Sequence, residues 1–158
     1  MVAKCRAPFA EAKAPVAAML KREREDGLDG PAPYKAFKER IFQHREELRS
    51  FVENARRTGR MILGYGASTK GNVILQFCGF SEEDIPFIGE VNREKIGCYT
   101  PGTVIPIISE DQARMKKPDY FMVLPWHFRE NIILREAEYL QSGGRLFFPL
   151  PVLEVVVG

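Results

Sequence analysis

The sequence predicts an α/β protein with a Rossmann-like, three-layer αβα fold, in which N-terminal helices precede a mainly parallel sheet of about five strands. After residue 60, short and nearly continuous apolar runs alternate with amphipathic segments. This pattern is typical of parallel strands that are covered on both faces by helices. The first apolar run also leads through a glycine turn into a helix, in the stretch ILGYGASTKGNVIL from Ile62 to Leu75. With 158 residues, 45% of them hydrophobic, the chain is long enough for one compact domain.

The N-terminal part predicts a short helix followed by a linker. Between Pro15 and Asp26, apolar residues recur with charges between them, and proline suits a first helical position. Gly27 is expected to end this helix. The glycine- and proline-rich segment 27–33 can neither continue a helix nor pair in a sheet. We therefore expect an N-terminal helix and linker in residues 1–32 and the Rossmann-like domain in residues 33–158.

A long helix is predicted next, ending near Gly59. Apolar residues alternate at spacings of three and four, which places them on one stripe that must cover an apolar surface. The residues of this stripe are Tyr34, Phe37, Ile41, His44, Leu48, Phe51 and Ala55. The favoured interpretation of His44 is a histidine packed at a helix contact, with a ligand role as the alternative.

The remaining elements follow from short apolar runs and the amphipathic segments between them. Strands are expected near residues 60–65, 86–91, 104–107, 119–124 and 144–148, and helices near 69–79, 109–115 and 128–141. Right-handed connections between these strands give a doubly wound sheet with fewer strands than a complete dinucleotide-binding domain.

Composition excludes several classes of function. Lys and Arg number 23 against 21 Asp and Glu, and the charges are interleaved, so neither nucleic-acid nor membrane binding is expected from bulk charge. Cys5, Cys78 and Cys98 are odd in number and widely spaced, which predicts neither a disulfide framework nor a metal site. No apolar run approaches the ~18 residues of a membrane-spanning helix. The N-terminus also lacks the apolar segment of an export signal, so we expect a soluble, cytoplasmic protein.

The glycine turn is a candidate anion site. Gly64 and Gly66 permit a tight turn and a close approach of ligand, while backbone N–H groups and the helix dipole favour negative charge there. Thr69 occupies the position of the third glycine in the dinucleotide fingerprint, which weakens an NAD interpretation. Lys70 precedes Gly71 instead of following the last glycine, which excludes the P-loop pattern.

A phosphate or pyrophosphate held without a metal therefore fits this turn, since Ser68 and Thr69 can cap the helix and Lys70 adds a charge. The alternative is a glycine turn kept only for packing. Glu90 ends the second strand about 20 residues later, where a Rossmann domain places an acid on a ribose hydroxyl; a solvated or salt-bridged glutamate is the alternative.

The end of the fourth strand supplies a second group of candidate residues. In the doubly wound order, Trp126 and His127 lie beside the first strand and face the glycine turn across the switch-point crevice. Such a crevice suits a ring plus a phosphate, and His127 could also donate to an oxyanion or move a proton. The alternative is that Trp126 only closes the edge of the core.

Four ordered motifs resemble one known family. The sequence is similar, over roughly residues 33–157, to the C-terminal domain of S-adenosylmethionine-dependent C-methyltransferases that act on nucleotide-linked keto-deoxysugars. The motifs are YGASTKGN at 65–72, EVNREKIGCYTPGTVIPI at 90–107, KPDYFMVLPWHF at 117–128 and GGRLFFPLP at 143–151. Residues 16–28 resemble the helix that joins this domain to the preceding one.

The resemblance implies a longer enzyme of three parts: a zinc-binding domain, a methyltransferase domain that holds S-adenosylmethionine, and this C-terminal domain. In that family a proton is removed beside the sugar ketone, and the enolate attacks the methyl group of S-adenosylmethionine. The catalytic Tyr, Glu and His belong to the middle domain, so no catalytic residue and no metal ligand is assigned in this chain. We expect S-adenosylmethionine to serve the full-length enzyme and not to bind this chain alone. The isolated chain is expected to be inactive in methyl transfer.

The substrate side does carry over, because the family's nucleotide-sugar lies between the middle and C-terminal domains. Individual contacts are assigned from the crevice argument. The predicted substrate-binding residues are Gly64, Gly66, Ala67, Ser68, Thr69, Lys70, Asn72, Glu90, Trp126 and His127. The expected partners are a nucleotide-sugar and a methyltransferase domain or companion chain, with self-association possible through exposed surface. The alternative functions are an NAD- or nucleotide-binding oxidoreductase-like domain and a structural interaction module.

Overall fold

The computed structural model describes residues 12–158. The chain forms two compact units, of which the first ends at Ile41 and the second comprises Phe42–Gly158. The expected boundary at residue 32 stays a prediction. The elements follow one another as α1 (Lys13–Glu25), α2 (Ala32–Arg57), β1 (Ile62–Tyr65), α3 (Thr69–Cys78), β2 (Ile88–Glu90), β3 (Ile107–Ser109), α4 (Glu110–Met115), β4 (Tyr120–Val123), the 3-10 helix η1 (Trp126–Phe128), α5 (Arg129–Arg135), α6 (Ala137–Gln141), β5 (Arg145–Phe148) and β6 (Glu154–Val157).

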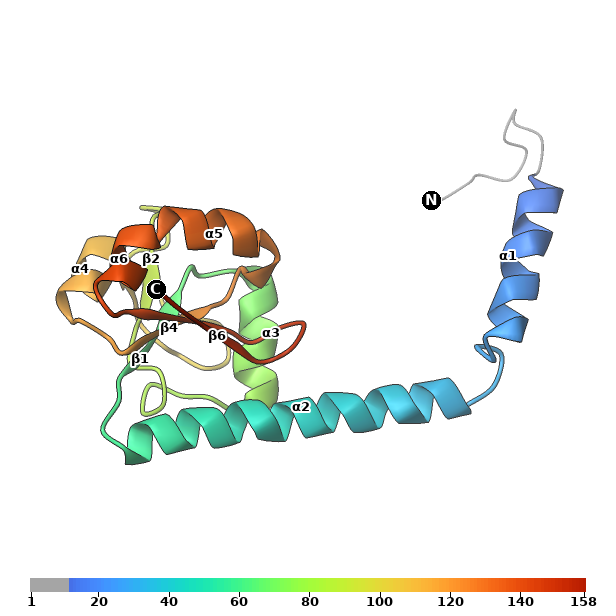
Figure 1. Ribbon diagram of the computed structural model, residues 1–158, viewed down its shortest axis with the longest axis horizontal. Coiled ribbons are helices and arrows are strands. Elements are labelled where there is room, and N and C mark those ends of the chain that lie inside the picture. Colours follow the sequence, from blue (N-terminus) through green and yellow to red (C-terminus); the bar gives the residue numbers. More distant parts are fainter. Residues whose placement is uncertain (1–11) are drawn as a thin grey trace. The chain divides into compact units, whose positions relative to one another are not determined.

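The second unit is built on one sheet that is flanked by helices (Figure 1). The strands of this sheet follow the order β3-β2-β1-β4-β5-β6. Strands β1 to β5 are parallel, and β6 pairs antiparallel with β5. The predicted Rossmann-like, mainly parallel sheet is confirmed. The chain leaves β1 toward β2 on one side and later returns to β4 on the other, so the strand order reverses between β1 and β4. In sheets of this kind, ligands bind at the carboxyl ends of the strands at that reversal.

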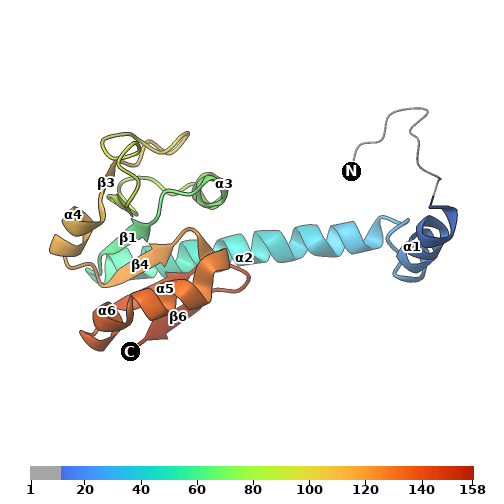
Figure 2. The same ribbon diagram turned by 90° about the horizontal axis from the view of Figure 1, so that it is seen from above.

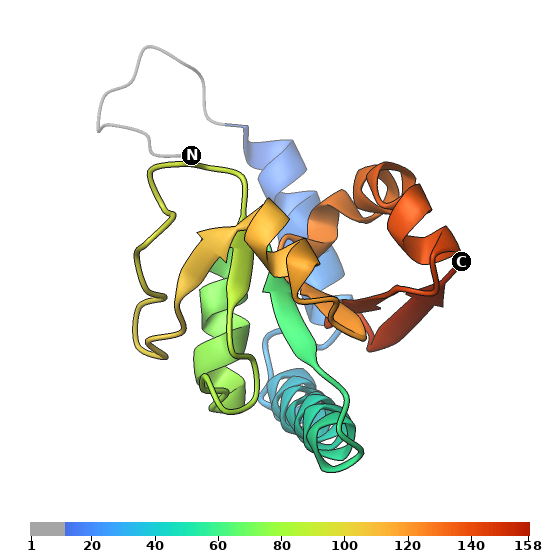
Figure 3. The same ribbon diagram turned by 90° about the vertical axis from the view of Figure 1, so that its left-hand side faces the viewer.

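Helices cover both faces of the sheet, as Figure 3 shows in a view toward its edge. Side chains alternate between the two faces, as the period of a strand requires. Ile62 and Met122 pack with buried residues of α2 and α3, whereas Leu63, Phe121 and Leu146 pack with those of α4, α5 and α6. Each fully buried side chain of this size contributes roughly 1.5–3 kcal/mol through removal from water. The three-layer arrangement thus follows from strands that are apolar on both sides.

The C-terminal half of α2 forms part of one helical layer. Its Leu48, Val52 and Ala55 are buried. Phe51 stacks at 4.5 Å from the ring of Phe147 and packs edge-on against Tyr120 at 5.4 Å. No helix lies between β2 and β3 in this chain, so α2 and α3 together supply the cover for that face.

The N-terminal half of α2 differs from the expectation. The side chains of Tyr34 and Phe37 are 58% and 55% exposed, so the first residues of the predicted stripe are not buried. His44 matches its favoured interpretation: its Nε2 lies 2.6 Å from the carbonyl oxygen of Pro149, and its side chain is largely buried. A helix contact accounts for this histidine.

Several predicted boundaries are corrected. Strand β3 begins at Ile107 and not at residue 104, because Val104 has a left-handed backbone (φ +56°) and Pro106 has no N–H to donate. The single helix expected over 128–141 is divided at Glu136 into α5 and α6, with η1 before them. Strand β6 was not predicted.

The N-terminal helices also differ in detail. Helix α2 begins at Ala32, inside the expected linker, and Pro15 lies at the third position of α1 and not at its first. Pro15 and Pro33 lie in the first turns of α1 and α2, where their missing N–H would have no partner within the helix. Within residues 12–158, no helix is both long and apolar enough to cross a lipid bilayer.

Candidate functional site

The glycine turn connects the end of β1 to the start of α3, and its two first glycines have different roles. Gly64 lies inside β1, where a Cβ would come within 2.7 Å of the Ile88 side chain, so its absent side chain is required for packing. Gly66 has φ +76° and forms the turn itself. Ser68 then caps α3, with its hydroxyl accepting the Gly71 N–H at 2.9 Å. The predicted capping role of Ser68 is confirmed.

Gly71 performs the packing role that the fingerprint gives to its third glycine. A Cβ on Gly71 would lie 2.6 Å from the Leu124 Cβ, so α3 approaches the end of β4 closely only because this residue has no side chain. The missing glycine at Thr69 is therefore replaced by one placed two residues later. Gly71 was not recognised from the sequence as the counterpart of the third glycine, because it lies two positions later than the fingerprint spacing requires.

Glu90 joins the glycine turn to the segment after β2 and is 7% exposed. Its carboxylate accepts hydrogen bonds from the amides of Ala67 (2.9 Å), Val91 (2.8 Å) and Asn92 (2.9 Å), with the Lys95 ammonium at 3.5 Å. Burial by itself raises the pKa of this carboxyl, but these amides and the ammonium outweigh burial and hold the pKa below its usual value. Glu90 therefore holds two loops together, and its hydrogen-bonding capacity is used within the protein.

The donors that face solvent are those at the start of α3. Thr69 and Lys70 are exposed. Within residues 12–158, the backbone N–H groups of Ser68, Thr69 and Lys70 form no hydrogen bond. Orphan amides of a first helical turn, together with the helix dipole, favour an anion. The arrangement can hold a phosphate through the first turn of α3, while Ala67 at the turn itself already has a carboxylate partner.

Asn72 lies on the same helix, one turn after Ser68. Its Oδ1 is buried and accepts no hydrogen bond from the residues that the structure describes. Buried polar atoms are nearly always paired in folded proteins, so an unpaired one near a proposed ligand site is a notable exception. Asn72 therefore stays among the candidate binding residues.

Trp126 and His127 follow β4 at the same edge of the sheet. Trp126 is partly buried and packs against the buried residues of both faces of the sheet, which matches the interpretation that it closes the edge of the core. His127 is exposed, and its ring lies 5.9 Å from that of Trp126 and 4.3 Å from that of Phe128. Pro125 contacts Gly66 across the reversal, since a Cβ on Gly66 would lie 3.1 Å from its ring. The structure thus brings the start of this tip next to the glycine turn.

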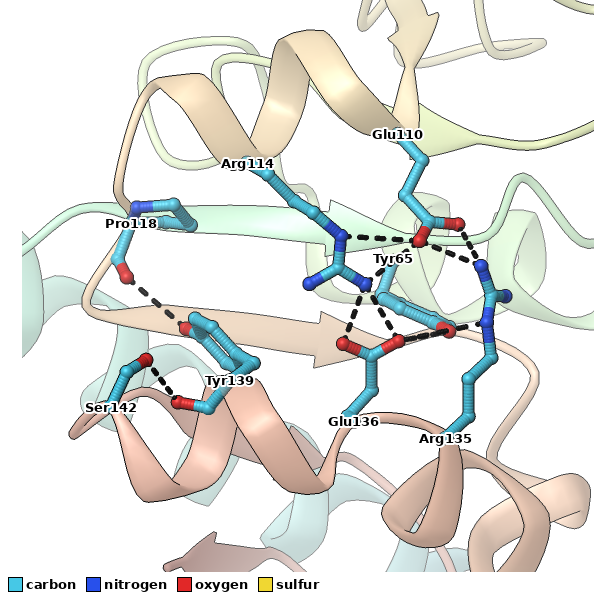
Figure 4. A network of polar contacts seen from close by, with 8 residues as sticks. All are labelled: Tyr65, Glu110, Arg114, Pro118, Arg135, Glu136, Tyr139 and Ser142. Carbon is cyan, nitrogen blue, oxygen red and sulfur yellow. Dashed lines mark hydrogen bonds and ion pairs between the residues drawn. The ribbon is translucent and has the colours of Figure 1, made fainter.

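A charged network beneath the turn was missed by the sequence analysis (Figure 4). The Tyr65 hydroxyl, from the last residue of β1, donates to Glu136 at 2.9 Å. Glu136 is 1% exposed, and both its oxygens accept from Arg114, at 2.6 and 2.7 Å. Arg114 and Arg135 each also pair with Glu110, at 2.7 and 2.6 Å. Burial and the neighbouring Glu136 raise the pKa of Tyr65, so its hydroxyl stays a proton donor.

This network connects β1, α4, α5 and the junction between α5 and α6 on one face of the sheet. Its two carboxylates and two guanidinium groups balance in charge, and the buried Glu136 is fully paired, which is the condition under which a buried charge is tolerated. A buried glutamate inside an expected amphipathic helix carries no periodic signal, so the pattern of apolar residues could not have revealed it. The network fixes the residue that precedes the glycine turn and leaves the turn itself partly exposed.

Two cavities lie elsewhere. A cavity of about 500 Å³ is found at the amino end of the sheet, opposite the glycine turn. A second cavity of about 410 Å³ borders the charged network. Neither is lined by the predicted substrate-binding residues. Among residues 12–158, no group of three or more His, Cys, Asp or Glu is arranged to hold a metal ion.

The mainly parallel sheet covered by helices, with its strand order reversing between β1 and β4, places the chain in the class of Rossmann-like α/β domains. The chain is a member of the family described as the C-methyltransferase C-terminal domain, whose model matches residues 1–151. It is 36% identical over 146 residues to the C-methyltransferase NovU of Streptomyces niveus. That match covers 92% of this chain but 35% of the relative, so the chain spans about a third of the relative's length. The family match gives no support to an NAD-dependent oxidoreductase.

Proposed function

We propose that this chain is the substrate-binding domain of an S-adenosylmethionine-dependent C-methyltransferase, and that it holds a nucleotide-linked keto-deoxysugar. A companion methyltransferase domain supplies the cofactor and the catalytic groups. The observation that carries the proposal is that an exposed first helical turn and an exposed aromatic tip meet at the β1–β4 reversal. The family membership supplies the reaction class.

The contacts that support this function come from two elements. The amides of Thr69 and Lys70 and the Lys70 ammonium are suited to the pyrophosphate, because a helix N-terminus and a cation both favour negative charge. The His127 ring, exposed beside Trp126, is suited to stack on or donate to the ring system of the ligand. Gly66 lets the ligand approach the backbone of the turn.

The residues of this chain do not fit S-adenosylmethionine in the way a Rossmann domain usually holds an adenosine. That binding mode requires an acidic side chain at the end of β2 to take the ribose hydroxyls. Glu90 occupies that position, but its two oxygens already accept three backbone amides. We therefore assign the cofactor and the methyl transfer to the companion domain.

Calorimetric titration of the chain with a thymidine diphosphate keto-deoxysugar tests the proposal, with a parallel titration using S-adenosylmethionine. We expect heat from the nucleotide-sugar and none from S-adenosylmethionine. Lys70→Gln should weaken binding about tenfold, or ~1.4 kcal/mol, by removing one charge from the phosphate site. Lys117→Gln, which removes an exposed charge at the opposite edge of the sheet, should leave the affinity unchanged.

Tight binding of S-adenosylmethionine without a response to the nucleotide-sugar would refute this function. The single tryptophan of the chain also distinguishes the oxidoreductase alternative. Quenching of Trp126 fluorescence by micromolar NADH would favour that alternative, whereas quenching by the nucleotide-sugar alone supports the proposal.

A further inference from the structure

We propose that the exposed side of α3, with the loop that precedes β3, is the surface on which the companion methyltransferase domain docks. The proposal rests on the proposed function and deepens it, because it names where the partner binds. We call this the α3 surface and define it by Phe42, Val73, Phe77, Tyr99 and Val104.

Three apolar side chains of this surface come from helices α2 and α3. Val73 and Phe77 are one helical turn apart on α3 and are 66% and 39% exposed. Phe42, 43% exposed, makes an edge contact with Phe77 at 5.7 Å between ring centroids. Contiguous exposed apolar groups of this kind mark interaction sites more often than singly scattered ones.

The loop continues the surface from α3. The Gln76 side chain donates to the carbonyl oxygen of Pro101 at 3.0 Å, which places the loop against the helix (Figure 2). In this loop, Tyr99 and Val104 are 62% and 61% exposed. The loop is ordered from within, because the buried Thr100 accepts the N–H groups of two later residues through its carbonyl and its hydroxyl.

Val104 is held in a conformation that its side chain disfavours. Its φ of +56° is left-handed, which costs an L-residue roughly 1–2 kcal/mol and is a genuine outlier for a β-branched one. Glycine or asparagine would relieve this cost. An apolar, strained side chain that is turned to solvent contributes little to the stability of this domain. A partner that covers it accounts for its presence.

The occupant follows from the family and from the length of the relative. The chain belongs to a C-terminal domain family and covers 35% of NovU, so most of such an enzyme lies outside the described residues. Helix α3 begins at the glycine turn, one turn before Val73. A domain docked on the α3 surface would therefore border the proposed substrate site and could close it.

The test measures binding between this chain and the part of NovU that lies outside the match, by calorimetry or sedimentation. We expect a complex, and we expect Val73→Glu to weaken it at least tenfold. Val104→Asn should also weaken it while leaving the melting temperature equal or higher, because asparagine tolerates the left-handed backbone. If Val104 only stabilised the fold of this domain, Val104→Asn would lower the melting temperature as well as the affinity. Leu134→Glu is the matched control, since Leu134 is 77% exposed on α5.

The outcomes are separate from those of the proposed function. Absence of a complex with the unaltered chain, or equal weakening by Leu134→Glu, would overturn the α3 surface as the docking site. So would self-association of the chain that Val73→Glu abolishes, because the occupant would then be a second copy. Nucleotide-sugar binding is read independently from the calorimetric titration, because none of these residues is among the proposed substrate-binding residues.

Discussion

Among single residues, Glu90 shows how the structure changes the meaning of a position that the sequence assigns to a ligand. The carboxylate is placed at the end of β2 as expected, but it accepts three amides of the protein. Such charged hydrogen bonds contribute about 1.5–3 kcal/mol each, and a donor left unpaired by their loss is costly. The residue therefore acts on the shape of the glycine turn.

Replacing Glu90 by Gln should lower the free energy of unfolding by about 2–3 kcal/mol, because one amide donor would then face the NH₂ group. The pKa of Glu90 is lowered on folding, so its stabilising contribution is present above about pH 5 and is lost as the pH falls through the lowered pKa. Urea unfolding between pH 3 and pH 7 should show a shallower acid loss of stability in the variant. Equal acid dependence in both proteins would contradict this role. Glu94→Gln, at an exposed position, is the control.

The two described cysteines should differ in reactivity. Cys78 is 1% exposed, and burial raises the pKa of its thiol to about 11, so little thiolate is present at neutral pH. Cys98 is exposed. At pH 8, iodoacetamide should label Cys98 within minutes and Cys78 only after unfolding, as peptide mass mapping can show. Rapid labelling of Cys78 in the native protein would mean that α3 opens from the sheet.

At the scale of elements, the predictable parts are those with a periodic signal. The five parallel strands and the helices that begin near 69, 109 and 128 follow from apolar runs and from turn residues. Strand β6 lacked such a signal, since it is short, lies at the edge of the sheet and follows two prolines in the segment Phe148–Leu153. The start of β3 was misplaced because an apolar run was taken for a strand where Val104 is left-handed. The left-handed backbone of Val104 prevents a strand from starting there, although the apolar run predicts one.

Gly71 gives an element-scale prediction. Gly71→Ala should destabilise the protein by about 1–3 kcal/mol, because the new Cβ would meet Leu124 at 2.6 Å and overpack the contact of α3 with β4. Helix propensity alone predicts the opposite sign, by about 1 kcal/mol. Thermal unfolding followed by circular dichroism decides between them. A raised melting temperature would show that α3 can shift without cost. Val73→Ala, at an exposed position of the same helix, should change stability by less than about 0.5 kcal/mol.

For the whole molecule, the sequence was enough to predict the layers and the edge at which the strand order reverses. The reversal between β1 and β4 follows from the order of elements, so Gly66, Ser68 and Trp126 could be placed at one edge in advance. The Glu136 network could not, because it depends on which buried side chains meet after folding. Gly71 was missed as a packing glycine for the same reason. The spacing of a motif shows where the backbone turns. Which side chains from different helices and strands meet in the core is known only from the folded structure.

The division into two units gives a prediction for the whole chain. None of the residues of α1 is buried, and a 13-residue helix without tertiary packing is only marginally stable in water. Its ion pairs, such as Lys21 with Glu25 at 3.6 Å, are exposed and add at most a few tenths of a kcal/mol. We therefore expect α1 to unfold locally in the isolated chain far more often than the sheet does.

Brief trypsin digestion should then cut first after Lys21, Arg22 or Arg24 and leave a resistant fragment that contains the whole second unit. Arg129 and Arg135 serve as internal controls, because both are ion-paired on a helix that packs on the sheet. Mass spectrometry of the fragments over time gives the order of cleavage. Cleavage at these controls as early as in α1 would contradict the prediction. An α1 that resists trypsin while the second unit is cut would show that α1 is stabilised by packing within this chain. Protection of α1 only after the companion domain is added would place its packing partner in that domain.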